Sequence, residues 1–208
     1  YQIVNLYMVM GGIPYYLEQV KKGLSATQNI EKICFEETGL LQSEFKFTFS
    51  SLFKNAAQHE QILRKIYELG SRATRENLVK KANVPSSGDL TSKLNELEES
   101  GFLKSYVPFG GNKNRKIYVI SDYYTLFYLR FVENAGTYEA GNWVNRINDP
   151  AINVWAGLAF EQICWDHVRN IKKALGIEGI YSETSSWYKA ADPESGGAQI
   201  DLIIDRKD

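Results

Sequence analysis

This sequence has little net charge and few cysteine or histidine residues. Lys and Arg number 24 against 25 Asp and Glu, so a formal net charge of −1 gives no global field drawing the chain to nucleic acid or a membrane surface. With two Cys, two His and no Cys-x-x-Cys spacing, the sequence argues against a structural zinc site. Cys34 and Cys164 lie far apart, which favours reduced thiols packed as small hydrophobic side chains.

Long apolar runs are missing as well. No stretch approaches the ~18 to 20 apolar residues of a membrane helix, and no signal peptide is visible. We therefore expect a cytoplasmic protein without a membrane partner. The chain begins with Tyr1 rather than Met, and we expect it to be a piece of a longer protein.

Aromatic residues, in contrast, are abundant, and their spacing is mostly helical in residues 1–55. The chain has 13 Tyr, 10 Phe and 4 Trp, and 44% of its residues are hydrophobic, as in a globular protein. Ser25 or Thr27 is placed to cap one helix. A later helix has an apolar stripe made of Phe45, Phe49, Leu52 and Phe53. This piece is too small to enclose its own core, so we expect it to pack on a larger neighbour.

Residues 56–133 have the pattern of three helices and a hairpin. The first helix ends at Gly70, Thr74 is placed to cap the second, and Gly101 ends the third. The third helix turns Leu90, Leu94 and Leu97 inward. Two short strands around the loop GGNKN follow. The order predicts a winged helix-turn-helix with an apolar exit helix.

Residues 134–208 begin with a Gly- and Asn-rich linker, followed by one long helix over 151–176. Val154, Leu158, Glu161, Trp165 and Val168 form a single stripe on that helix, with Glu161 in its middle. A carboxylate on an apolar stripe is costly unless it is paired, protonated or bound to a metal. The alternative is that the stripe is wide enough for Glu161 to reach solvent.

The last strand places Asp201, Ile203 and Asp205 on one face. Acidic residues fit a half-buried strand poorly, so Asp201, between two apolar residues, is the more informative of the two aspartates. A Glu and an Asp from different elements would suit Mg²⁺, which takes one or two carboxylates and keeps its waters. Glu161 and Asp201 are therefore the candidate metal ligands and catalytic residues.

These segments carry a resemblance to a known family. The pair LAFEQICWDHV and GAQIDLIID resembles the start of the PD-(D/E)XK nuclease fold, in the version that follows ATPase and winged-helix modules in prokaryotic P-loop (AAA+/STAND-like) ATPases. MVMGGIPYYLEQV is similar to the helical lid of that ATPase module, and SLFKNAAQHEQILRKIYELG and YVISDYYTLFYLRFV to the borders of its winged helix. The resemblance covers nearly the whole chain.

The resemblance implies an α+β chain in three parts. These are a helical lid remnant over 1–55, a winged helix over 56–133 and a truncated nuclease-like α/β domain over 134–208. Glu161 and Asp201 match the first two positions of the nuclease motif. Asp205 and Lys207 have the letters of its third position but lie on the same strand as Asp201, so we read them as a false match. We expect no nuclease activity from the chain alone.

The resemblance also implies an ATP-binding module in the intact protein. This sequence contains no G-x-x-x-x-G-K-[ST] loop, so we expect ATP to bind the intact protein only. The motifs and the resemblance together leave two alternative functions. One is ATP-coupled action on nucleic acid, with Mg²⁺ at Glu161 and Asp201. The other is a non-catalytic module that binds protein partners or regulates the ATPase.

Contact with DNA would fall to the wing. The third helix of the winged helix carries Lys93 against Asp89, Glu96, Glu98 and Glu99, which disfavours groove readout. The wing contains three basic residues, Lys113, Arg115 and Lys116. They could bind a phosphate backbone. The alternative is that they form an ordinary solvated hairpin tip. His59 and His167 have no partner at metal-ligand spacing, and we expect both to be structural.

Overall fold

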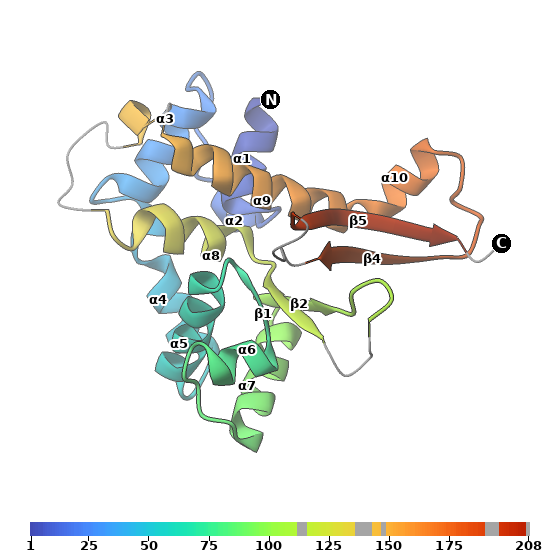
Figure 1. The fold of residues 1–208 in the computed structure, drawn as a ribbon. Coiled ribbons are helices and arrows are strands. Elements are labelled where there is room, and N and C mark those ends of the chain that lie inside the picture. The colour runs from blue at the N-terminus through green and yellow to red at the C-terminus, as the bar shows by residue number, and fades with distance from the viewer. Residues whose placement is uncertain (112–115, 136–142, 147–148, 190–195, 207–208) are drawn as a thin grey trace.

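The computed structural model describes residues 1–111, 116–135, 143–146, 149–189 and 196–206, and it is a mixed α+β fold with two small antiparallel sheets (Figure 1). The α-helices are α1 Gln2–Met10, α2 Pro14–Leu17, α3 Ala26–Ile30, α4 Leu40–Leu52, α5 Ala56–Glu68, α6 Arg75–Lys80, α7 Gly88–Glu99, α8 Tyr123–Phe127, α9 Pro150–Asp166 and α10 Val168–Ala174. The strands are β1 Arg72–Thr74, β2 Leu103–Tyr106, β3 Ile117–Ile120, β4 Ser182–Lys189 and β5 Ala198–Arg206. Single π-helical turns extend α3 and α8.

The N-terminal helices pack against α8, as expected for a piece that cannot enclose its own core. Of the two candidate caps, Ser25 is the one used: its hydroxyl accepts from Gln28 N, and the Gln28 side chain accepts from Ser25 N. Phe45 and Phe49 of α4 are buried. Leu52, predicted in the same stripe, is 56% exposed, because α4 ends there and the extended Phe53 enters the core in its place.

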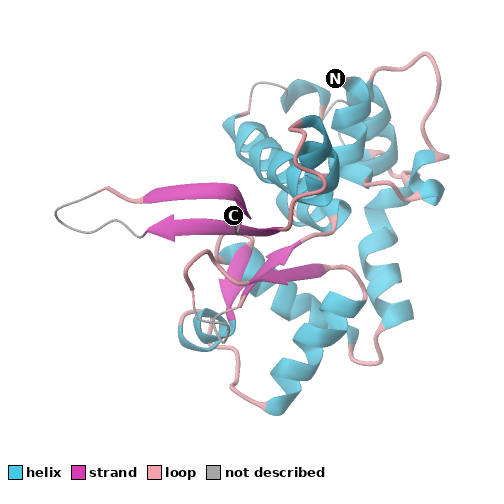
Figure 2. Cartoon of the chain, turned by 90° about the vertical axis from the view of Figure 1, so that its right-hand side faces the viewer, coloured by secondary structure: helices cyan, strands magenta, loops and turns pink. Residues whose placement is uncertain are grey.

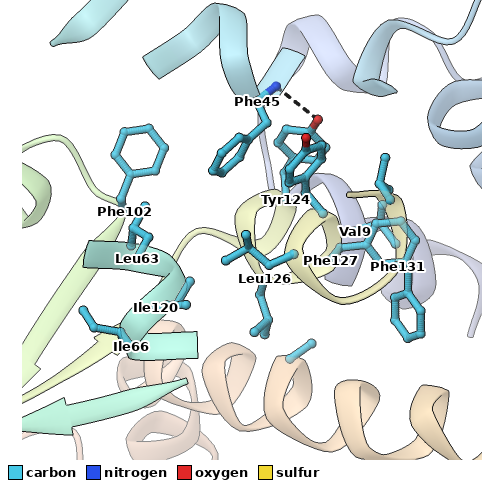
Figure 3. Close-up of a cluster of buried hydrophobic side chains, with 14 of the residues drawn as sticks. Val9, Phe45, Leu63, Ile66, Phe102, Ile120, Tyr124, Leu126, Phe127 and Phe131 are labelled. Atoms are coloured by element: carbon cyan, nitrogen blue, oxygen red, sulfur yellow. Dashed lines mark hydrogen bonds between the residues drawn. The ribbon is translucent and has the colours of Figure 1, made fainter. Parts of the chain in front are cut away.

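The centre of the molecule is α8, whose five residues are all buried. The Tyr124 hydroxyl donates to the Leu41 carbonyl and accepts from the Phe45 amide at 3.2 Å (Figure 3). The ring of Phe45 stacks on Tyr128 with centroids 4.3 Å apart. Hydrogen bonds and aromatic stacking therefore both hold α4 against α8.

Residues 56–120 form α5, β1, α6, α7, β2 and β3 in that order. Leu90, Leu94 and Leu97 are buried as predicted, and the Thr74 hydroxyl caps α6. The sequence did not predict β1, which pairs with β3 and gives the sheet order β1-β3-β2. A three-residue strand has too few positions to show alternation, and it forms here because β3 offers a pairing edge.

The C-terminal part differs from the prediction in two ways. The expected single helix is divided into α9 and α10 at His167, whose backbone leaves the helical region. The buried face of α9 consists of Trp155, Ala159 and Gln162, whereas Val154 is 58% exposed. The true stripe lies one residue further along, because Trp155 packs edge-on against Phe127 of α8 at 5.2 Å.

The antiparallel hairpin of β4 and β5 projects from the side of the molecule in both views (Figures 1 and 2). One continuous hydrophobic cluster runs from Met8 on α1 to Ala159 on α9. The division into three parts at 55 and 133 stays a prediction. Both cysteines are free. Within the described segments, no helix is both long and apolar enough to cross a membrane.

Candidate functional site

Glu161 lies on α9 next to the buried face of the helix, and its side chain is 18% exposed. One nitrogen of Arg72, Nη2, donates to both of its oxygens, at 3.0 Å to Oε1 and 2.9 Å to Oε2. Arg72 comes from β1, 89 positions earlier in the chain. Of the alternatives that the sequence left open, the structure therefore gives a half-buried, paired carboxylate.

Asp201 lies on β5, where the hairpin meets α9. The indole Nε1 of Trp165 donates to its backbone carbonyl at 3.0 Å. The Gln199 side chain donates to its carboxylate oxygen Oδ1. The contact with Trp165 holds this end of the hairpin on α9, while the Asp201 side chain stays exposed.

The two carboxylates affect each other electrostatically. Burial is the largest cause that raises the pKa of Glu161 above its ordinary value, and the negative charge of Asp201 raises it further. The Arg72 guanidinium acts in the opposite direction without cancelling the shift. Glu161 is a half-buried carboxylate close to the negative charge of Asp201, so an additional positive charge is favourable beside it.

Glu161 and Asp201 line one cleft of about 730 Å³, and Arg72 lines it too. The cleft lies between β1 and α6 on one side and α9 and the hairpin on the other. Asp205 is not among its described lining residues and stands opposite Glu183 in the β4–β5 register. Lys207 lies outside the described residues.

The donor types at this cleft fit Mg²⁺, because carboxylate oxygens are the ligands it prefers. Its geometry fits less well, since Arg72 Nη2 occupies the position between the two oxygens of Glu161. Over the part of the chain that the structure describes, no group of three or more His, Cys, Asp and Glu side chains could hold a metal. The roles of Glu161 and Asp201 as metal ligands and catalytic residues stay predictions.

The proposed wing contact can be placed only in part. Lys113 and Arg115 lie outside the described residues, and Lys116 is exposed just before β3. The role of these three residues in binding nucleic acid stays a prediction.

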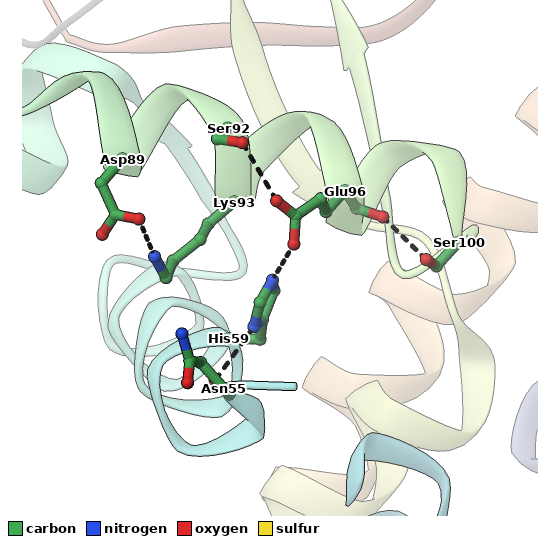
Figure 4. Close-up of polar contacts among 7 residues, drawn as sticks. All are labelled: Asn55, His59, Asp89, Ser92, Lys93, Glu96 and Ser100. Atoms are coloured by element: carbon green, nitrogen blue, oxygen red, sulfur yellow. Dashed lines mark hydrogen bonds and ion pairs between the residues drawn. The ribbon is translucent and has the colours of Figure 1, made fainter. Parts of the chain in front are cut away.

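The charges of α7 are arranged differently from what the sequence suggested. Lys93 is 6% exposed and forms an ion pair with Asp89, and Glu96 accepts from His59 and Ser92 (Figure 4). Two of the four acids counted against groove readout therefore have partners within the protein. The Asp89–Lys93 pair is already balanced in the count of one basic against four acidic residues, so α7 stays predominantly acidic.

His59 is a structural residue whose contacts could not be predicted from the sequence. It is buried, stacks on Phe53 with ring centroids 4.0 Å apart, and lies 2.8 Å from Glu96 through Nε2. Its Nδ1 lies 3.1 Å from the Asn55 carbonyl. The two contacts tie the ring to Glu96 of α7 and to the start of its own helix α5. Only the spacing of Asn55 and His59 was visible in the sequence, because Glu96 is 37 positions away.

Comparison with known proteins finds a distant relative. The uncharacterized protein MJECL04 of Methanocaldococcus jannaschii is 25% identical over 205 residues, which cover 97% of this chain and 44% of the relative. The chain thus spans less than half of that relative's length. No protein-family model matches the chain, and no solved structure matches it. The relative brings no activity to this chain.

Proposed function

We propose that this chain is the winged-helix and nuclease-like part of a P-loop ATPase that acts on nucleic acid. The observation that carries the proposal is that Glu161 and Asp201, forty positions apart, line the same cleft and interact electrostatically. ATP binding belongs to the rest of the intact protein, because this sequence has no P-loop motif.

The order of elements over residues 56–120 supports the winged-helix part of the proposal. Helix α5, strand β1, helices α6 and α7 and the pair β2–β3 follow one another, with β1 adding a third strand to the sheet. In such a fold α7 would be the recognition helix and the β2–β3 loop the wing. Lys113, Arg115 and Lys116 of that wing would contact the phosphate backbone without reading sequence.

The nuclease-like part rests on Glu161 of α9 and Asp201 of β5. These two carboxylates would hold Mg²⁺, and the ion would orient water toward a phosphodiester when bound. Glu161 must first exchange its contact with Arg72 for the metal. Burial raises the pKa of Glu161 most and the charge of Asp201 raises it further, and a bound cation would stabilise the ionised carboxylate against both effects.

Binding of Mn²⁺, a paramagnetic substitute for Mg²⁺, tests this proposal directly. Titration of the chain with Mn²⁺, followed by water proton relaxation, should give one saturable site. Asp201→Asn and Glu161→Gln should each abolish it, and Asp205→Asn, a matched change on the same strand, should leave it intact. A chain that shows no saturable site, or a site that survives Asp201→Asn, would remove the metal-dependent function.

A second candidate function is a non-catalytic module that binds a protein partner or regulates the ATPase. The ion pair between Arg72 and Glu161 favours it, because it already satisfies the carboxylate that a metal would need. The projecting hairpin also exposes Tyr188 and Ile200, at 64% and 49%. This candidate gains if Mn²⁺ binding is absent and if changing Lys113, Arg115 and Lys116 to Ala leaves a DNA mobility shift unchanged.

A further inference from the structure

A second cavity, the inner cavity, adjoins the cleft of Glu161 and Asp201 and shares Arg72 and Glu161 with it. It measures about 330 Å³ and lies between the three-stranded sheet and α9, with the C-terminal end of α7 at its edge. That volume is at the lower end of the ~300–1,000 Å³ typical of pockets for small molecules. Its apolar lining includes Leu103, Ile120, Leu126 and Leu158. Such a lining suits the apolar body of a small ligand.

One wall of this inner cavity is aromatic. The rings of Tyr106 and Trp165 stack with centroids 5.1 Å apart and an interplanar angle of 23°. The hydrogen bond from Trp165 to the Asp201 carbonyl fixes the orientation of the indole. A fixed Trp–Tyr pair is a favourable surface for a planar cation, since the face of each ring carries negative charge.

Most charges at the inner cavity are already neutralised within the protein. Arg72 pairs with Glu161, and Lys104 pairs with Asp166. The exception is Glu98, which lines the cavity and has no ion-pair partner among the residues that the structure describes. The cavity therefore carries one uncompensated negative charge.

The position of Glu98 on its helix adds to that charge. It lies in the last turn of α7, which contains no basic residue. The C-terminal end of a helix carries a partial negative charge, so an acidic side chain there is unfavourable and a cation is stabilising. The helix end and the Glu98 carboxylate thus both favour a positive ligand at this edge of the cavity.

We propose that the inner cavity is a binding site for a small organic cation with a planar, apolar body. The body lies on the apolar lining and against Trp165 and Tyr106, and its positive group pairs with Glu98. A bound ligand touches β2, β3 and α9 together, so it stabilises the packing of α9 on the sheet. The proposal does not depend on metal binding at Glu161 and Asp201.

Thioflavin T, a planar aromatic cation that becomes fluorescent when immobilised, is the probe for this site. It should bind the chain and raise its unfolding temperature, whereas the aromatic anion anilinonaphthalene sulfonate should bind more weakly. Glu98→Gln should weaken binding of thioflavin T by about tenfold, because the cation loses its Coulombic attraction to the carboxylate. Glu99→Gln, a matched change at the exposed neighbouring acid, should leave affinity within about twofold of the wild type.

A cavity-filling change checks the location of the bound probe. Val119 of β3 also lines the cavity, and Val119→Phe should block thioflavin T while the chain still unfolds cooperatively. Leu158→Phe on α9 repeats the test from the opposite wall. The proposal is overturned if Glu98→Gln leaves affinity unchanged, if both Phe variants still bind the probe, or if the anion binds as tightly as the cation.

Discussion

The guanidinium of Arg72 bridges both oxygens of Glu161, with Nη2 at 2.9 and 3.0 Å, and so ties β1 to α9. The two side chains are 26% and 18% exposed, so the pair is shielded from most of the solvent. It lines both the cleft of Glu161 and Asp201 and the inner cavity. The pair is therefore a structural link between two parts of the chain, and Arg72 competes with the metal ion of the proposed site for Glu161.

Arg72→Gln should strengthen Mn²⁺ binding by about tenfold, which corresponds to ~1.4 kcal/mol. The reason is that Glu161 then offers both oxygens to the ion without first losing a guanidinium partner. Proton relaxation titrations of the wild type and the variant measure the change. Arg75→Gln is the control, because Arg75 bonds to Thr91, Ser86 and Ser87 instead of Glu161. Equal Mn²⁺ affinities of the wild type and Arg72→Gln would rule out competition by Arg72.

The same pair should contribute to the stability of the fold. Arg72→Met leaves Glu161 half-buried without its cation and should lower the free energy of unfolding by about 1–3 kcal/mol. The double variant Arg72→Met with Glu161→Gln should recover part of that loss, because no buried charge is then left uncompensated. Urea unfolding of the wild type, both single variants and the double variant gives the coupling energy. Additive effects would mean that the two residues do not interact in solution.

The contact between His59 and Glu96 should make stability depend on pH in the acidic range. The hydrogen bond from His59 is the largest cause that lowers the pKa of Glu96 below its ordinary value of 4.5. A carboxyl with a lowered folded-state pKa stabilises the fold above its unfolded pKa, and this contribution is lost as the pH falls through the folded value.

Urea unfolding midpoints measured between pH 6 and about pH 3 test this dependence. Asp149 also has a lowered pKa, caused mainly by Arg146, so it titrates in the same range and needs its own control. The acid side of the stability profile of Glu96→Gln should be flatter than that of the wild type. Asp149→Asn should remove a separate part of the pH dependence. A profile that Glu96→Gln leaves unchanged would contradict the contact.

Tyr124→Phe should destabilise the chain by about 1–3 kcal/mol, because it removes one partner from two buried backbone groups. Those groups are the Leu41 carbonyl and the Phe45 amide. Tyr188→Phe, at a residue that is 64% exposed, should change the free energy of unfolding by less than about 0.5 kcal/mol. Equal midpoints for Tyr124→Phe and the wild type would show that water satisfies both groups.

Local signals in the sequence were sufficient for many elements of the fold. The ends of α5 and α7 were predicted from Gly70 and Gly101, whose φ angles of 92° and 81° suit glycine. The cap at Thr74 and the buried face of α7 were predicted from residues within one or two turns of each other. These features depend on neighbours in the chain, so periodicity and capping rules reach them.

The candidate site could be predicted from the sequence only in part. The resemblance to a nuclease fold singled out Glu161 and Asp201, and the structure brings both to one cleft. It gave no indication of Arg72, because β1 is a strand of three residues without a pattern of its own. The apolar stripe predicted from helical spacing misplaced the buried face of α9 by one residue, since Trp155 packs on α8 and sets the rotation of the helix.

Most helices and strands can be located from the sequence, because backbone hydrogen bonds, caps and turns depend on residues close together in the chain. Which side chains contact one another depends on the tertiary fold. Arg72 and Glu161 are 89 positions apart, and His59 and Glu96 are 37 apart. Such partners are chosen by how the helices rotate and pack around α8, and that packing is a property of the whole core.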